Sequence, residues 1–238
     1  MSRRVKNAII SAACAIVGFA FLLAPRQAAG DVIDRIVATV NGHIILQSDW
    51  DEAMCYEALS GNRKLTDFSE EERRAVLNRL IDQELLREQM KPSDFPQVSD
   101  TEFAARIAEV RKQYPEAADE QGWQAILLRY HLTEKDFHAH IRQQIELMRL
   151  VDARLRPAVE IDSKSIEAYY HEQFVPKLKQ TGAAEVPLAE VSGQIRELLT
   201  QQKVGELLVS WLHTLRSEGQ VSVPGSPDSG ADTGVQSR

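Results

Sequence analysis

The chain has 238 residues and a formal net charge of −7, with 28 Lys and Arg against 35 Asp and Glu. A chain this acidic lacks the basic surface that binds nucleic acid or anionic lipid, so neither partner is expected. The length is sufficient for one substantial hydrophobic core or for two smaller ones.

The first thirty residues have the organisation of a secretory signal peptide. Three basic residues precede an apolar run at 8–24, and small residues at 28–30 stand before Asp31. We expect cleavage after Gly30, export from the cytoplasm and no stable membrane insertion of the mature chain. An uncleaved anchor is the alternative, because an apolar run of this length is close to the shortest membrane span. Cleavage would leave 208 residues with a charge of −11, because the segment holds four basic and no acidic residues.

Residues 32–46 predict a β-hairpin. Two runs rich in β-branched residues, 32–40 and 43–46, flank the dipeptide Asn41-Gly42. This dipeptide favours a type I′ turn, because both central positions need a positive φ that glycine adopts freely and asparagine tolerates. An isolated hairpin is marginally stable in water, so we expect a third strand or a packed helix beside it.

Capping residues followed by apolar residues at helical spacing predict the next three helices. The first begins at Ser48, with Asp51 in the position of the capping-box acid, and ends at residues 60–62. The second and third begin with capping boxes at residues 69–72 and 99–102. Each of these two is followed by a proline.

The second half of the chain is also predicted to be helical. Residues 123–130 form a short amphipathic segment, and Asp162 or Ser163 caps a later helix that ends near Val175. Between them, Thr133 caps a helix of about six turns. One face of this helix has the apolar residues Phe137, Ile141, Ile145, Met148, Val151 and Leu155.

A long helix from Pro187 to Gly219 and a short strand at residues 220–223 complete the predicted elements. We expect this strand to join the hairpin, because the hairpin alone leaves both of its outer edges unpaired. Its two valines would then cover Ile36 and Val37 by strand alternation. The predicted fold class is therefore mainly α, with a small antiparallel sheet that joins the N- and C-terminal segments.

No residue pattern indicates catalysis, a cofactor or a metal ion. His138 and His140 are two positions apart on a predicted helix, so their side chains point about 200° apart and cannot share an ion. The sequence lacks a glycine-rich phosphate loop and a Gly-x-Ser-x-Gly motif. Cys55 has no cysteine partner once the signal peptide is removed, and we expect it to be a small buried residue.

The order of several segments resembles the SurA family of periplasmic chaperones. Residues 34–49 are similar to the opening of the mature family members. Further similar segments follow in the same order along the chain: residues 80–86 in the second helix, 98–102 at the start of the third, 132–145 in the long fifth helix and 195–216 in the closing helix.

The resemblance implies a multi-helix peptide-binding core similar to those of SurA and trigger factor. It also implies a periplasmic, ATP-independent holdase that binds unfolded outer-membrane or secreted polypeptides in an apolar groove. The candidate peptide-binding residues are Met54, Trp123, Tyr130 and Tyr170, since methionine and aromatic side chains make adaptable contacts. Core packing is the alternative role for each of them.

The parvulin-type prolyl isomerase domains of the family have no counterpart in this sequence. They usually lie between the sixth helix and the closing helix, where this chain has only residues 176–186. An independent domain needs at least about 50 residues. We therefore expect no isomerase activity. The alternatives to a holdase are an isomerase-related accessory protein and an envelope scaffold that binds one fixed partner.

The expected domain organisation follows from these assignments. It comprises a signal peptide at 1–30, a chaperone core at 31–175, a short linker at 176–186, a closing helix and strand at 187–223, and a tail at 224–238. The tail is rich in Pro, Gly, Ser and Asp and is expected to be disordered, because it can bury little apolar surface. Client identity and oligomeric state do not follow from the sequence.

Overall fold

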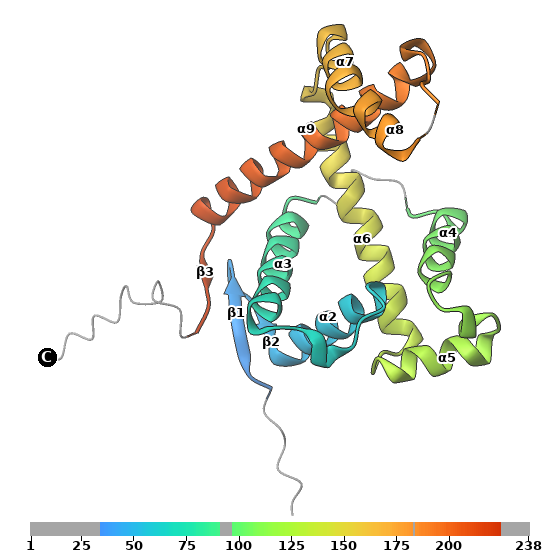
Figure 1. The fold of residues 1–238 in the computed structure, drawn as a ribbon. Helices are drawn as coiled ribbons and strands as arrows, with labels where there is room; N and C mark the ends of the chain where they lie inside the picture. Colours follow the sequence, from blue (N-terminus) through green and yellow to red (C-terminus); the bar gives the residue numbers. More distant parts are fainter. Residues whose placement is uncertain (1–33, 91–96, 183, 225–238) are drawn as a thin grey trace, which may run out of the picture. The chain divides into compact units, whose positions relative to one another are not determined.

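The computed structural model describes residues 34–90, 97–182 and 184–224. The expected signal peptide and the tail beyond residue 224 lie outside these residues. The described chain is mainly helical, with a three-stranded antiparallel sheet in the order β2-β1-β3 (Figure 1). The predicted fold class is confirmed.

The hairpin consists of β1 (Ile36–Val40) and β2 (His43–Leu46). Both residues of the turn have a positive φ, 49° at Asn41 and 87° at Gly42, as a type I′ turn requires. The strand register shifts between Ile36 and Ala38. This irregularity breaks the alternation of faces, and the consecutive residues Val37 and Ala38 are both buried.

The third strand, β3 (Val221–Ser222), pairs with β1 at the other end of the described chain (Figure 1). Val221 lies opposite Val40. The Asn41 amide donates to the Gln220 carbonyl at 2.9 Å, and Asn41 Oδ1 accepts from the Gln220 amide at 2.7 Å. The prediction that the two ends meet in one sheet is confirmed.

The valines near the end of the chain cover one of the two predicted hairpin residues. Val37 is buried in an apolar cluster against which Val221 and Val223 pack. Ile36, in contrast, is 43% exposed. The expectation for Ile36 was wrong, because the register shift places it outside the regular alternation of β1.

The helix α2 (Gln47–Ser60) follows β2 without a loop. Its N-cap is Leu46, whose backbone amide donates to the Asp49 carboxylate at 2.8 Å. The predicted cap at Ser48 with Asp51 was therefore wrong. Asp49 is the acid that satisfies an amide at the start of the helix, so the helix begins before the serine.

The remaining elements are mostly helices and short turns. They are 3₁₀ turns at Leu65–Asp67, Pro115–Ala117 and Arg156–Ala158, a π-helical turn at Tyr170–Phe174, and α3 (Glu70–Glu88), α4 (Asp100–Arg111), α5 (Glu120–Arg129), α6 (Glu134–Leu155), α7 (Ser163–Tyr169), α8 (Val175–Thr181) and α9 (Leu188–Glu218).

Four of these helices have the caps that the sequence predicts. The side-chain oxygens of Ser69, Ser99, Thr133 and Asp162 each accept a backbone amide three residues later. Glu102, expected to complete the capping box at Ser99, has its carboxylate bonded by Arg149 of α6.

The helix predicted to end near Val175 continues as α8 to Thr181, into the segment predicted as a linker. Pro176 would break a regular α-helix, because it lacks an amide proton and its ring meets the carbonyl four residues earlier. The π-helical turn accommodates it: the Val175 amide donates to the Tyr170 carbonyl, five residues back.

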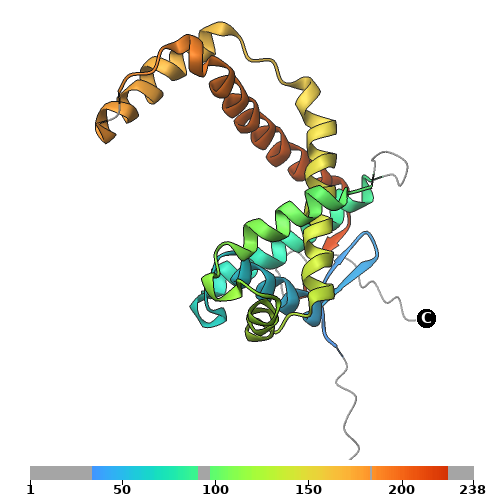
Figure 2. The same cartoon turned by 90° about the vertical axis from the view of Figure 1, so that its right-hand side faces the viewer.

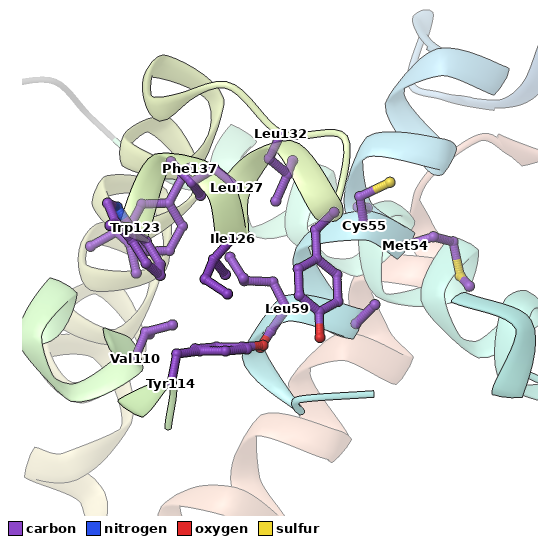
Figure 3. Close-up of a cluster of buried hydrophobic side chains, with 14 of the residues drawn as sticks. Met54, Cys55, Leu59, Val110, Tyr114, Trp123, Ile126, Leu127, Leu132 and Phe137 are labelled. Carbon is purple, nitrogen blue, oxygen red and sulfur yellow. The ribbon is translucent and has the colours of Figure 1, made fainter. Parts of the chain in front are cut away.

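Buried side chains form three clusters. The first core joins α2, α4, α5 and the start of α6; Figure 3 draws fourteen of its residues and labels ten of them. The second core joins the sheet, α3, the later half of α6 and the end of α9. The third core joins α7, the π-helical turn, α8 and the start of α9. In both ribbon views α6 passes α3 and α4, and it contacts both as well as α9 (Figures 1 and 2).

Candidate functional site

The four peptide-binding residues predicted from the sequence are all buried. Met54, Trp123 and Tyr130 belong to the first core, where Met54 and Trp123 are visible in Figure 3, and Tyr170 belongs to the third. Trp123 packs edge-on against Phe137, with ring centroids 5.0 Å apart. The Tyr170 hydroxyl donates to the Val186 carbonyl at 2.7 Å. These side chains have packing roles in this structure, and a role in peptide contact stays a prediction.

Three cavities lie along α6, which contributes residues to the lining of each, and we refer to them as the α6 cavities. The first, of about 380 Å³, lies between α2, α3, α4 and α6. The second, of about 340 Å³, lies between α4 and α6, and the third, of about 460 Å³, lies between α3, α6 and α9. They adjoin one another: Gln144 and Leu147 line the first and third, Arg106 lines the first and second, and Met148 lines the second and third.

The first cavity has an aromatic wall. The ring of Tyr56 stacks on His140, with centroids 4.5 Å apart. His140 Nε2 lies 2.8 Å from a carboxylate oxygen of Glu52, and the Tyr56 hydroxyl donates to Gln144 Oε1 at 3.3 Å. Burial raises the pKa of Tyr56, so its hydroxyl stays protonated at neutral pH. This wall can pack against apolar side chains while it keeps hydrogen-bonding groups beside them.

The charged residues around the α6 cavities are paired with one another. Each arginine bonds a carboxylate: the pairs are Arg79 with Glu57, Arg106 with Glu109, Arg149 with Glu102 and Arg156 with Glu197. The bond from Arg156 lowers the pKa of Glu197, which stays ionised. The charges of the lining residues therefore largely balance, and the lining favours uncharged groups over a strongly charged ligand.

Side-chain amides supply the other polar groups of the lining. Gln83, Gln143 and Gln144 face the first cavity, and Gln83 and Gln144 also line the third. An amide offers two donor protons and an acceptor oxygen. These groups can bond to a polypeptide main chain of any sequence, next to the apolar surface of Leu80 and Leu147.

Met148 is the exposed large apolar residue in the lining of the α6 cavities. It lies on α6 between the second and third cavities and is 60% exposed. The helical spacing puts Met148 on one apolar face with Ile141 and Ile145, but the structure buries only those two of the three. The first half of α6 buries Ile141 and Ile145, but the second half buries Leu147 and Leu150 against the second core. The buried face turns along the helix because the packing partners change.

The sequence contains a pattern from which the exposure of a residue such as Met148 could have been predicted. Residues 145–151 of α6 include apolar residues at 145, 147, 148, 150 and 151. A single buried stripe on a helix cannot include all five, because consecutive residues point about 100° apart. At least one apolar side chain in this stretch had to face outward.

Comparison with known proteins gives a family. The model of the SurA-like N-terminal domain matches residues 1–151, which end within α6. No curated protein matches the chain. A similar solved structure comes from work on the virulence factor PEB4 and the periplasmic protein Cj1289, two structurally related SurA-like chaperones of Campylobacter jejuni. That match has 12% identity and a TM-score of 0.46, over 81% of this chain and 100% of the other. None of the helices in the described part of the chain is long and apolar enough to span a bilayer.

Proposed function

The chain belongs to the SurA-like N-terminal domain family, and from this we propose that it is an exported, ATP-independent chaperone that holds unfolded polypeptides in the α6 cavities. In this proposal residues 31–175 form the chaperone core, and the closing helix and strand at 187–223 pack on it. Its clients are unfolded outer-membrane or secreted proteins. The observation that supports the α6 cavities as the binding site is Met148, an exposed and flexible apolar side chain at the wall between two of them.

The composition of the site suits a client without a fixed sequence. Aliphatic and aromatic walls bind apolar side chains, and the glutamine amides bind main-chain groups that every polypeptide has. The paired charges in the lining give little attraction to one particular charged ligand. Binding of this kind needs no nucleotide, because the client is held and released by an equilibrium between bound and free states.

Export follows from the organisation of residues 1–30, and we propose that the periplasm is the working compartment. The mature protein recovered from the cell envelope should begin at Asp31 by mass spectrometry. A terminus at Met1 in that fraction would contradict cleavage.

The test of the function is suppression of aggregation. The purified mature protein should delay aggregation of several unrelated unfolded outer-membrane proteins after dilution from urea, without ATP. Met148→Glu should weaken client binding at least about tenfold, because the lost apolar burial is worth about 1.5–3 kcal/mol and 1.4 kcal/mol corresponds to a factor of ten.

The matched control is Val209→Glu on α9. Val209 is 70% exposed and lines none of the α6 cavities, so the same charge there should leave client binding within twofold of the native value. Equal losses in the two variants would contradict the site. Binding to a single protein among many would indicate a scaffold with a fixed partner, and turnover of a proline-containing peptide would indicate an isomerase-related protein.

A further inference from the structure

Three side chains that can bind a metal ion lie together where the hairpin meets α3. His43 is the first residue of β2, and Glu84 and Glu88 are one turn apart on α3. One donor atom from each lies within 4.8 Å of the other two. No metal site is predicted from the sequence, because His138 and His140 point apart on their helix and no other ligand pattern occurs. His43 lies 41 residues before Glu84, so only the fold brings these groups together.

The distances between the donor atoms are close to those found around a coordinated cation. A tetrahedral Zn²⁺ site has Zn–N distances of about 2.0–2.1 Å and Zn–O distances of about 2.0–2.2 Å, which place neighbouring donor atoms about 3.3–3.5 Å apart. His43 Nδ1 lies 3.6 Å from Glu84 Oε1. This separation is slightly longer than that range, and the donor atom of the exposed Glu88 lies within 4.8 Å of the other two, so the three groups would have to move closer together around an ion.

The carboxylates are oriented by neighbours that hold them in place. Asn41 Nδ2 donates to Glu88 Oε2, and the Asn41 side chain is itself fixed by its bond from the Gln220 amide. Glu84 is only 14% exposed and accepts two bonds from Arg87, at 3.0 Å and 2.6 Å. Hydrogen bonds of this kind to ligating carboxylates orient them and commonly strengthen metal sites.

The charge at this place favours a cation. Two carboxylates and one positive group, Arg87, lie beside the His43 ring, and these three charged groups together have a formal charge of −1. Arg87 and a metal ion can share Glu84, because a carboxylate has about four lone-pair positions. The ion would replace the repulsion between Glu84 and Glu88 with attraction.

We propose that His43, Glu84 and Glu88 bind a divalent first-row transition metal ion of the Zn²⁺ class, with water in the remaining position. One imidazole nitrogen and two carboxylate oxygens match the ligand preferences of this class. The bound ion would tie the hairpin turn to α3. Through Asn41, which contacts both Glu88 and Gln220, it would also support the pairing of β3 with β1.

Calorimetric titration with ZnCl₂ tests the site on the mature protein, without a histidine tag and after removal of metals with a chelator. The native protein should bind one equivalent with a micromolar or lower Kd. His43→Gln and Glu88→Gln should each weaken binding at least tenfold while their circular dichroism stays native.

The control is Glu134→Gln on α6. Glu134 lies 3.8 Å from His138 in an ordinary pair one turn apart, and among the described residues this pair belongs to no metal-binding group of three. Its removal should leave the zinc affinity within twofold of the native value. Equal affinity in the native protein and both site variants would overturn the proposal, as would a native Kd in the millimolar range.

A second measurement identifies the ligand atom. Nitrogen-15 NMR of the histidine rings should show a zinc-dependent shift of His43 Nδ1, the atom nearest Glu84. Mg²⁺ and Ca²⁺ should produce no such shift at the same concentration, because they prefer six or more oxygen ligands. A zinc-dependent shift confined to other histidines would place the ion elsewhere and overturn the assignment.

Discussion

Gly122 occupies a position with no room for a side chain. A Cβ there would lie 2.2 Å from the carbonyl oxygen of Glu116 and 3.1 Å from Asp119 Oδ1. The Gly122 amide donates to the same Asp119 carboxylate at 2.7 Å, which caps α5. The close approach of Glu116 therefore depends on the absence of a Cβ at the beginning of the helix.

Gly122→Ala should destabilise the protein by about 2 kcal/mol or more, because the backbone of the 3₁₀ turn at Pro115–Ala117 must move. Urea unfolding followed by circular dichroism measures the change. Gly205→Ala on α9 is the control: a Cβ there meets nothing within 4 Å. That variant should be more stable by about 0.5–1 kcal/mol, because alanine is the better helix former. Equal loss in both variants would rule out the steric explanation.

The helix α6 has a cap that depends on an ionised carboxylate. Thr133 Oγ1 accepts the Asp136 amide at 3.1 Å, and Asp136 Oδ2 accepts the Thr133 hydroxyl at 2.6 Å and the Thr133 amide at 3.2 Å. These bonds, the hydroxyl bond foremost, lower the pKa of Asp136. A carboxyl whose pKa is lower in the folded state stabilises the fold above its unfolded pKa, and this contribution is lost as the pH falls through the folded pKa.

Asp136→Asn should lower stability at pH 7 by about 0.5–1 kcal/mol, at the low end for a cap because solvent reaches the carboxylate. The difference between the two proteins should shrink below about pH 4, since the native Asp136 is then also becoming neutral. Urea unfolding of both proteins between pH 7 and pH 3 measures this. A difference that stays constant over the range would mean that ionisation of Asp136 contributes nothing.

At the scale of the whole molecule, the last described strand closes the sheet on the first. Val221 and Val223 are partly buried against the second core. Arg216 at the end of α9 bonds Asp82 of α3 at 2.6 Å and the Asn78 carbonyl at 2.9 Å. The attachment of α9 to α3 is therefore separate from the pairing of β3.

A chain that ends at Gly219 should be less stable than one that ends at Val223 by about 1–3 kcal/mol, because it loses β3 and two partly buried valines. The Arg216 bonds remain in both, so thermal or urea unfolding of the pair isolates the contribution of the strand. The chain that ends at Val223 should match the mature protein. Equal stability of the two truncations would show that β3 pairing adds nothing to the fold.

The features that the sequence determined alone depend on local physics. The Asn41-Gly42 turn requires positive φ at both positions, and the structure has it. The caps at Ser69 and Thr133 need only a side-chain oxygen and an amide three residues away. The meeting of β3 with β1 followed from the unpaired edges of a hairpin, which is also a property of the segment itself.

The tertiary structure decided the features that depend on neighbours distant in sequence. The buried face of α6 turns toward the second core in its later half, and this exposes Met148. A π-helical turn admits Pro176 into a continuous helix. His43 reaches Glu84 and Glu88 only because the hairpin packs beside α3. Local spacing predicts where a helix begins, but the face that it buries and the side chains that it brings together depend on what packs against it.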